Sequence, residues 1–414
     1  MEFNKGLIYK LIDNKIDKLE LYDLNEQELN TLYHALNLNH SLKKLYLYFG
    51  QIEDIILLCK LLENNSCLQV LSLNYNQIKD ITPLKFLKNN YCLKKLYLGN
   101  NKIEDITFLK FLSNSYLKEL YLGNNKIKDI TPLKYLSNYC LEDLNLGNNK
   151  IENITPLKFL SNYCLKTLNL SYNQIKDITP LKFLNNSCLQ KLYLNNNKIE
   201  DISTLKFLSN SCLNYLDLSN NQIEDITPLK FLNNSCLKYL YIDNNKIKDI
   251  TPLNFLKNNY CLQELYLHYN KIKNITPLNF LENNHCLQKL SLSYNQIEDI
   301  TPLNLLSNYC LQELYLNNNK IEDITTLNFL SNSCLNFLDL SNNQIEDITP
   351  LNFLSNSCLK ELYLSNNQIE DITPLNFLSN SCLKELYLSN NQINNQDKQK
   401  IIELAELKQI KLYI

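Results

Sequence analysis

The chain has 414 residues, of which 45% are hydrophobic and 20% charged, and its formal net charge is -2. This composition excludes a disordered chain, and the small net charge argues against a nucleic-acid partner, because neutralising phosphates requires a surplus of basic side chains. Residues 1–15 lack the apolar core of a signal peptide, and no apolar run approaches the roughly 18 residues of a membrane span, so we expect a soluble, cytoplasmic protein without a membrane partner.

The N-terminal residues 1–67 are predicted to form a cap and degenerate repeats. Leucines at alternating positions in 16–21 and again in 42–47 predict two short strands. Between them a helix is expected from Asn25, where Glu28 completes a capping box.

Residues 68–393 contain one pattern, L-x-x-L-x-L-x-x-N-x-I, fourteen times at intervals of 24 or 25 residues. Its alternating leucines predict a short strand, and identical strands of successive repeats are expected to pair in parallel. The asparagine amide is expected to satisfy backbone groups where the chain leaves the strand. Each repeat therefore predicts one strand followed by a turn.

The second half of each repeat places isoleucine and leucine at intervals of three, which predicts a helical or 3-10 turn. In ten repeats this segment begins with Thr-Pro, as at Thr82–Pro83, and we expect the threonine to cap the turn. Residues 188–240 also match residues 310–362, which indicates an internal duplication. Residues 394–414 are predicted to form a C-terminal capping helix and strand.

The predicted fold class is an α/β solenoid. Strands about 4.8 Å apart opposite bulkier turns are expected to bend it into a horseshoe or arc, with a concave parallel sheet of about seventeen strands and short helical or 3-10 segments on the convex side.

These repeats resemble the leucine-rich repeat superfamily. The I-x-D-I-T-P-L segment is similar to the short-repeat subclass of bacterial internalins and phosphatase-regulatory leucine-rich proteins, whereas residues 19–45 are similar to the longer ribonuclease-inhibitor type. The resemblance implies a protein partner bound on the concave face.

One column of tyrosines lies between the second and third leucines of the pattern, on the expected concave face. Tyrosine is enriched at interface hot spots, although strands also favour tyrosine on solvated faces. We interpret the column as the partner-binding surface. Its predicted members are Tyr97, Tyr121, Tyr193, Tyr241, Tyr266, Tyr315, Tyr363 and Tyr387, with Tyr46 in the same column.

Thirteen of the fourteen cysteines recur at one position of the repeat, and Tyr116 takes that position once. No C-x-x-C pair predicts a metal site or a disulfide framework. We therefore interpret the cysteines as small, reduced core residues. No metal is expected.

Three glycines and four histidines are further candidates. Gly99, Gly123 and Gly147 follow consecutive strands, where they either admit a partner's backbone or satisfy a turn. The histidines, among them His268, show no partner acid and nucleophile in the sequence, so no catalytic residue is predicted.

The predicted function is a non-catalytic protein-interaction scaffold, which is not an enzyme and takes neither cofactor nor small-molecule substrate. The alternative is a regulatory subunit that docks onto an enzyme such as a protein phosphatase. An enzyme that uses the repeats as a substrate arm would need a non-repeat domain, and fewer than 25 residues follow Ile393.

Overall fold

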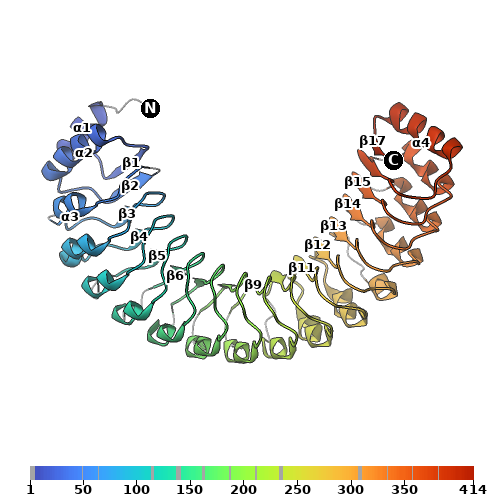
Figure 1. The fold of residues 1–414 in the computed structure, drawn as a ribbon, viewed down its shortest axis with the longest axis horizontal. Helices are drawn as coiled ribbons and strands as arrows, with labels where there is room; N and C mark the ends of the chain where they lie inside the picture. Colours follow the sequence, from blue (N-terminus) through green and yellow to red (C-terminus); the bar gives the residue numbers. More distant parts are fainter. Residues whose placement is uncertain are drawn as a thin grey trace. The chain divides into compact units, whose positions relative to one another are not determined.

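The computed structural model describes the chain except for residues 1–4, 49, 64, 113–115, 137–140, 161–163, 186–187, 210–211, 233–235, 306–309, 333, 357 and 381. The chain forms two compact units, which are considered separately: unit 1, Met1–Ser211, and unit 2, Cys212–Ile414. Each is a solenoid in which parallel strands lie on one side and short helical segments on the other (Figure 1).

The described residues of unit 1 form eight strands, and each pairs in parallel with the next along the unit. The strands are β1 (Lys18–Tyr22), β2 (Lys44–Tyr48), β3 (Val70–Ser72), β4 (Lys95–Tyr97), β5 (Glu119–Tyr121), β6 (Asp143–Asn145), β7 (Thr167–Asn169) and β8 (Lys191–Tyr193). Its helices are α1 (Lys5–Ile12), α2 (Glu26–Leu38) and α3 (Ile56–Leu62), followed by the 3-10 segments η1 (Thr82–Asn89), η2 (Thr107–Phe111), η3 (Thr131–Tyr135), η4 (Thr155–Leu160), η5 (Thr179–Leu184) and η6 (Ser203–Leu208).

Unit 2 has the same repeat, and its residues described by the structure form nine parallel strands. They are β9 (Tyr215–Asp217), β10 (Tyr239–Tyr241), β11 (Glu264–Tyr266), β12 (Lys289–Ser291), β13 (Glu313–Tyr315), β14 (Phe337–Asp339), β15 (Glu361–Tyr363), β16 (Glu385–Tyr387) and β17 (Lys411–Tyr413). The 3-10 segments are η7 (Thr227–Phe231), η8 (Thr251–Asn258), η9 (Thr276–Asn283), η10 (Thr301–Leu305), η11 (Thr325–Asn332), η12 (Thr349–Asn356) and η13 (Thr373–Asn380), and the unit ends with α4 (Asn395–Lys408) and β17.

The repeat's apolar residues form the core, as predicted. In the fourth strand's repeat, Leu96 and Leu98 of the strand region and Ile103 and Ile106 beyond the turn are fully buried, while Tyr97 is half-buried on the opposite face of the strand. Equivalent residues of neighbouring repeats stack, so one continuous apolar core runs through each unit.

The asparagine of each repeat holds the turn, which confirms its predicted task. Asn101 Nδ2 donates to the carbonyl oxygens of Leu73 (2.9 Å) and Leu98 (3.1 Å), and Asn101 Oδ1 accepts from the backbone N–H of Ile78 (3.1 Å). The side chain therefore connects its own turn to the preceding repeat, and buried backbone groups there do not lose hydrogen bonds.

The prediction that threonine caps the 3-10 segment was wrong. Thr82 is the first residue of η1, and its N–H donates to Asp80 Oδ1 (2.8 Å). The same bond recurs down the column. Where asparagine replaces aspartate, the Thr155 N–H donates to Asn153 Oδ1 (2.9 Å). The carboxylate two residues earlier thus satisfies the end of the segment, because a side-chain oxygen at that spacing reaches the free N–H.

The prediction that the cysteines lie in the core was also wrong. Cys67, Cys92, Cys188, Cys212, Cys236, Cys261, Cys286, Cys310, Cys334, Cys358 and Cys382 are exposed, Cys164 is partly exposed, and Cys140 lies outside the described residues. Only Cys59 of α3, which is outside the column, is buried among the described cysteines, and burial raises the pKa of its thiol.

A second asparagine column explains why the cysteines face outward. Asn90 is buried two residues before Cys92; its Oδ1 accepts from the Cys92 N–H (3.1 Å) and its Nδ2 donates to the Asn65 carbonyl (2.8 Å). Asn284 repeats this arrangement in unit 2. The amide occupies the interior position and the cysteine points away from it.

The terminal elements agree with their sequence signals. Asn25 caps α2 and forms a capping box with Glu28, and α4 begins after the N-cap Asn394, whose side chain accepts from the Asp397 N–H. Among the helices in the described ranges, none is long and apolar enough to cross a membrane.

Candidate functional site

The candidate site is the face of the sheet that points away from the core, here called the strand face. It consists of the first and third residues of each strand, the fifth of β1 and β2, and, from β3 to β16, the residue two positions beyond the strand. Strand alternation produces this face, because from β3 to β16 the central leucine of each strand is buried while its two neighbours lie on the opposite face of the strand. The predicted tyrosine column lies on the strand face, and all of its members are half-buried: Tyr46, Tyr97, Tyr121 and Tyr193 in unit 1, and Tyr241, Tyr266, Tyr315, Tyr363 and Tyr387 in unit 2.

Tyrosines of neighbouring repeats contact one another. Ring centroids lie 4.7 Å apart for Tyr241 and Tyr266, and 4.1 Å apart for the stacked rings of Tyr363 and Tyr387. Where tyrosines occupy consecutive repeats, they therefore form a packed aromatic ladder, which residues such as Ser291 interrupt, and such contacts add to the energy of burial alone.

Among the aromatic members of this ladder that were not predicted are Phe337 and Tyr215. Phe337 of β14 lies between Tyr315 (4.7 Å) and Tyr363 (5.1 Å), and Tyr215 of β9 contacts Tyr241 (5.4 Å). Both occupy the first strand position, which the sequence shows as variable. The signal in the sequence that could have identified them was an aromatic residue at a position expected on the strand face.

Glutamates of the adjacent column fix the tyrosine hydroxyls. Tyr241 Oη donates to Glu264 Oε2 (2.6 Å), and Tyr97 donates to Glu119. Burial, followed by these hydrogen bonds, raises the pKa of both phenols above the ordinary value. Glu119 also pairs with Lys95 (2.6 Å). The rings are thus held in place before any partner arrives.

The strand face of unit 2 brings His268 next to an acid and a hydroxyl, which corrects the prediction that it has neither. His268 Nε2 lies 3.3 Å from Asp243 Oδ2, and His268 Nδ1 lies 3.2 Å from Ser291 Oγ. Asp243 and Ser291 lie 25 and 23 positions from His268 in the sequence, so the stacking of repeats makes them neighbours. Burial lowers the pKa of His268 and raises the pKa of Asp243.

This polar chain does not present an open nucleophile. Ser291 is only 8% exposed, so a substrate carbonyl has little access to its hydroxyl in this conformation. The arrangement orients His268 on the strand face, next to the Tyr266 ring at 5.7 Å. Within the described parts of the chain there is also no group of three or more His, Cys, Asp or Glu side chains placed to hold a metal ion.

The glycine column has a packing cause that differs from both predicted explanations. None of the described glycines has positive φ, so turn preference does not select them. A Cβ at Gly147 would lie 2.8 Å from Asn169 Oδ1, and one at Gly123 would lie 2.8 Å from Asn145 Oδ1. Asparagine side chains fill the space in front of these two glycines, so they do not leave an open strip.

The turn that follows each strand carries residues in the left-handed region, usually asparagine. Tyr269 and Tyr294 adopt it instead (φ 51 and 52), although bulky residues rarely do. Their exposed rings stack with centroids 3.9 Å apart, beside a shallow hollow that Asn244 and Asn318 also line. This aromatic pair was missed by the sequence analysis.

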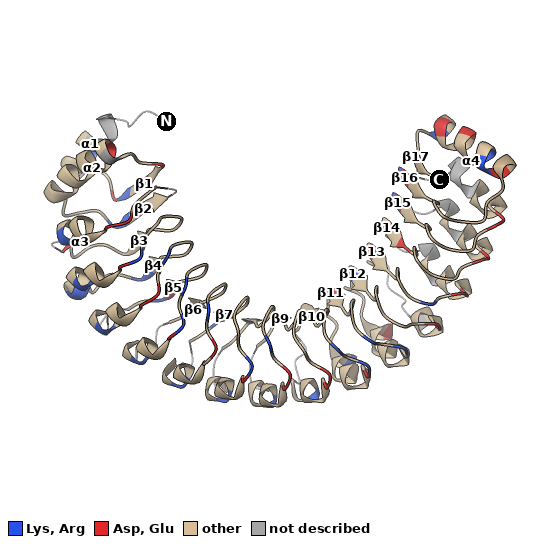
Figure 2. Ribbon diagram, in the orientation of Figure 1, with Lys and Arg blue, Asp and Glu red and all other residues tan. Residues whose placement is uncertain are grey.

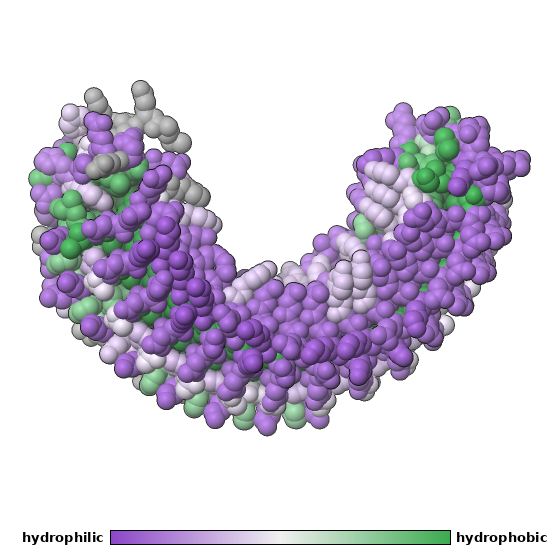
Figure 3. All heavy atoms as spheres, viewed as in Figure 1, coloured by the Kyte–Doolittle hydropathy of each residue, from purple (hydrophilic) through white to green (hydrophobic). Residues whose placement is uncertain are grey.

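The outer surface of the repeats, which carries the 3-10 segments, has two features that are also candidates for a binding site. Phe159, Phe183, Phe207 and Phe231 are 38% to 46% exposed, and a neighbouring lysine lies over each of the four rings, as Lys182 does over Phe183 at 5.2 Å. The surface visible in Figure 3 is mostly hydrophilic, with hydrophobic patches that include areas near both ends of the chain.

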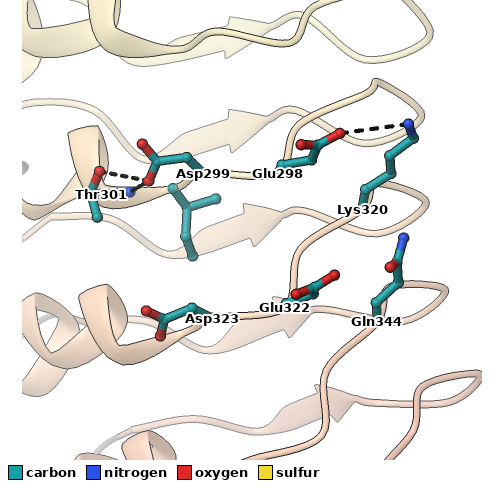
Figure 4. Close-up of a pocket in the computed structure, with 8 residues that line it drawn as sticks. Glu298, Asp299, Thr301, Lys320, Glu322, Asp323 and Gln344 are labelled. Atoms are coloured by element: carbon teal, nitrogen blue, oxygen red, sulfur yellow. Dashed lines mark hydrogen bonds and ion pairs between the residues drawn. The ribbon is translucent and has the colours of Figure 1, made fainter.

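The second feature is a set of stacked Glu-Asp pairs in unit 2, whose acidic residues appear in red in Figure 2. Two pairs, Glu298–Asp299 and Glu322–Asp323, line a hollow of about 550 Å³ (Figure 4). Asp299 Oδ1 accepts from the Thr301 N–H (2.8 Å), and Lys320 lies 3.6 Å from Glu298. The aspartate therefore has the capping task already described.

Family models confirm the repeat. Two models described as leucine rich repeat match this chain, one at residues 140–199, 187–247 and 357–413, and a two-copy model at 68–111, 117–159, 237–280, 262–305, 286–332, 311–353 and 335–377. The chain belongs to the leucine-rich repeat family. No match to this chain is found among curated proteins.

Solved leucine-rich repeat structures are similar over most of the chain. An internalin, InlF, of Listeria monocytogenes is 36% identical with a TM-score of 0.66, over 82% of this chain and 89% of that one. A leucine-rich repeat protein of Leptospira interrogans is 26% identical with a TM-score of 0.67, over 97% of this chain and 90% of that one. These likenesses confirm an internalin-like leucine-rich repeat protein.

A third structure shares the fold. The functional domain of InlJ from Listeria monocytogenes, described as including a cysteine ladder, is 20% identical with a TM-score of 0.54, over 92% of this chain and 77% of that one.

Proposed function

We propose that this protein is a non-catalytic interaction protein whose strand face binds a protein partner. The observation that carries the proposal is the aromatic ladder, in which half-buried rings contact one another and glutamates hold their hydroxyls. Rings fixed before binding lose little conformational entropy when a partner docks. Membership of a family that serves generally as a protein-interaction scaffold supports the same proposal.

The test compares two triple variants that each remove three aromatic rings. Tyr241→Ala, Tyr266→Ala and Tyr315→Ala remove rings from the strand face of unit 2, while Phe183→Ala, Phe207→Ala and Phe231→Ala remove exposed rings from the outer surface. The partner is first captured from the native cell and identified, and its affinity for each variant is then measured by titration.

We expect the strand-face triple to weaken binding about 30-fold or more, because one aromatic hot spot contributes about 2 kcal/mol and each 1.4 kcal/mol changes affinity tenfold. The outer triple should stay within about twofold of the wild type. Binding that survives loss of the strand-face rings but not of the outer rings would assign the partner to the outer surface. Circular dichroism checks that both variants remain folded.

The regulatory-subunit alternative differs in what the partner does after it binds. Under that alternative, adding the purified repeat protein to a captured enzyme changes the rate of that enzyme.

We also propose that the protein works in the cytoplasm, since a reducing compartment suits its column of exposed thiols.

A further inference from the structure

Two tyrosines of unit 2 occupy a backbone conformation that suits them poorly. From β3 to β16, the turn after each strand places one residue in the left-handed region, and in most repeats this residue is asparagine, which tolerates positive φ. Tyr269 (φ 51) and Tyr294 (φ 52) take the place in consecutive repeats. Their side chains are 46% and 40% exposed, so the core gives no reason for their bulk. Strained residues of this kind gather at functional surfaces.

The internal duplication provides a comparison within the same chain. The segment LHYNKIKNITPL of unit 2 corresponds to LGNNKIENITPL of unit 1, and the following repeat has LSYNQI in both copies. Tyr294 therefore corresponds to Tyr172, whereas Tyr269 corresponds to Asn148. Asn148 also has positive φ, and its Nδ2 donates to Asn124 Oδ1 of the preceding repeat. Tyr269 replaces a residue that the turn accepts more readily, and it creates a pair that the other copy lacks.

The two rings form a rigid, flat-sided block at the surface. They stack with centroids 3.9 Å apart and planes 11° apart, and hydrogen bonding to Tyr294 raises the pKa of the Tyr269 hydroxyl. Each ring has one face against the other ring and one face turned toward a repeat in which asparagine, Asn244 or Asn318, takes the equivalent place. Because asparagine is much shorter than tyrosine, no further ring of the turn column covers these outer faces.

The pair borders a hollow of about 700 Å³ that is lined mainly by amides. Lys271 is the only charged side chain among the described residues that line it. Asn244 Nδ2 donates to Asp243 Oδ2 (3.2 Å), which leaves Asn244 Oδ1 as an acceptor. Within the described parts of the chain, the Asn318 side chain forms no hydrogen bond, so it offers both a donor and an acceptor. The hollow therefore combines aromatic faces with neutral groups that donate and accept.

We infer that this hollow binds a neutral saccharide, with a sugar ring packed against the tyrosine pair and its hydroxyls bonded to the amides. A pyranose ring has an apolar C–H face that packs on aromatic rings, and its hydroxyls donate and accept as amides do. The volume lies within the range of about 300–1,000 Å³ that is usual for small-ligand sites. This site is distinct from the protein-binding surface proposed above.

Other classes of ligand fit the hollow less well. A cation would need a carboxylate, and a multiply charged anion would need more than the single ammonium of Lys271. A peptide segment is usually held by a strand edge or an apolar groove, and a row of amides is neither. Proline-rich peptides are the exception, because they dock on aromatic rings, so they are included in the test.

The probes are maltohexaose, cellohexaose and chitohexaose, each added to the full chain at millimolar concentration and followed by saturation-transfer NMR and titration. Mannitol, which has hydroxyls but no ring, and a hexaproline peptide are the control ligands. The first variant combines Tyr269→Asn and Tyr294→Asn, and it is expected to fold because asparagine is the usual residue of this column. The matched control combines Tyr75→Asn and Tyr172→Asn, two exposed tyrosines of the same conformation in unit 1. A second variant, Asn318→Asp, keeps the shape of the side chain but removes the amide donor.

We expect at least one hexasaccharide to receive saturation on its ring C–H protons, and mannitol and hexaproline to receive none. The unit 2 tyrosine variant should weaken saccharide binding at least tenfold and Asn318→Asp at least threefold, while the unit 1 control stays within twofold. Circular dichroism checks that the variants are folded. The inference is overturned if none of the three hexasaccharides binds, or if the two tyrosine variants weaken binding equally. Binding of hexaproline in place of the saccharides would assign the hollow to a peptide and overturn it as well.

Discussion

Removing one asparagine from the turn column tests how the solenoid is held together. Asn245 is 9% exposed, and its Nδ2 donates to the carbonyls of Leu218 (3.0 Å), Ile242 (3.2 Å) and Asp243 (3.0 Å). Its Oδ1 accepts from the Ile223 N–H of the preceding repeat (3.0 Å). Asn245→Ala deletes all of these bonds and leaves the backbone groups in place.

The largest penalty falls on the Ile223 N–H. The Leu218 carbonyl still accepts from Asn221 Nδ2 (3.0 Å), whereas the Ile223 N–H loses the acceptor that Asn245 supplied. A buried donor without a partner costs about 1–3 kcal/mol, and losing a satisfied hydrogen bond costs about 1 kcal/mol more. We expect Asn245→Ala to lower the free energy of unfolding by about 2–4 kcal/mol.

Because each repeat contacts only its neighbours, this loss should be local before it becomes global. Hydrogen exchange should quicken in β9, β10 and β11 and remain unchanged in β15 and β16, while urea unfolding gives the change in stability. The control is Lys248→Ala, an exposed residue of the same repeat, which should change stability by about 0.5 kcal/mol or less. Wild-type exchange in β9 to β11 together with an unchanged urea midpoint would refute the assigned role of the amide.

Three further outcomes are expected. Asp217→Asn with Asp339→Asn should raise the free energy of unfolding at pH 7. Burial raises the pKa of both carboxyls above 3.8, so the wild type gains stability relative to the variant as pH falls toward 4. Urea unfolding should therefore show a smaller difference in stability between variant and wild type at pH 4 than at pH 7, and a less stable variant at pH 7 would contradict this. Asp249→Ala should lower stability by about 1 kcal/mol by removing the bond from the Thr251 N–H (2.8 Å), whereas Asp249→Asn should not, and equal thermal shifts for both would count against the capping role. Ellman's reagent should modify at least eleven thiols of the folded protein and reach Cys59 only after unfolding; rapid modification of Cys59 in the folded state would show that α3 is open.

Much of the fold followed from residues that repeat without change. Alternating leucines, the turn asparagine and the spacing of three beyond it each have one physical task, and the structure places Leu96, Asn101 and Ile106 accordingly. The capping box at Asn25 was equally readable, because its two hydrogen bonds involve residues close in sequence. Such local or strictly periodic signals need no knowledge of packing.

The cysteine column shows where periodicity stops being informative. A small apolar residue at a fixed position predicts burial, yet Asn90 is inside and Cys92 outside, because the amide finds two backbone partners there. The same applies to Gly147, whose missing side chain is explained by the amide of Asn169 in the next repeat. Both outcomes depend on contacts between repeats, which a single repeat does not display.

The candidate site depends on neighbours that are about 24 residues apart in the chain. His268 has no acid or hydroxyl nearby in sequence, but parallel pairing sets it beside Asp243 of one repeat and Ser291 of another. In a lattice with the repeats of each unit as rows and the strand-face positions as columns, these three residues occupy neighbouring rows, so the repeat itself predicts their contacts. In that lattice the leucine columns specify the fold, while exchanges such as Asn169 for Asp217 alter charge without altering the hydrogen bonds beneath it. Partner choice is therefore expected to reside in those exchanges.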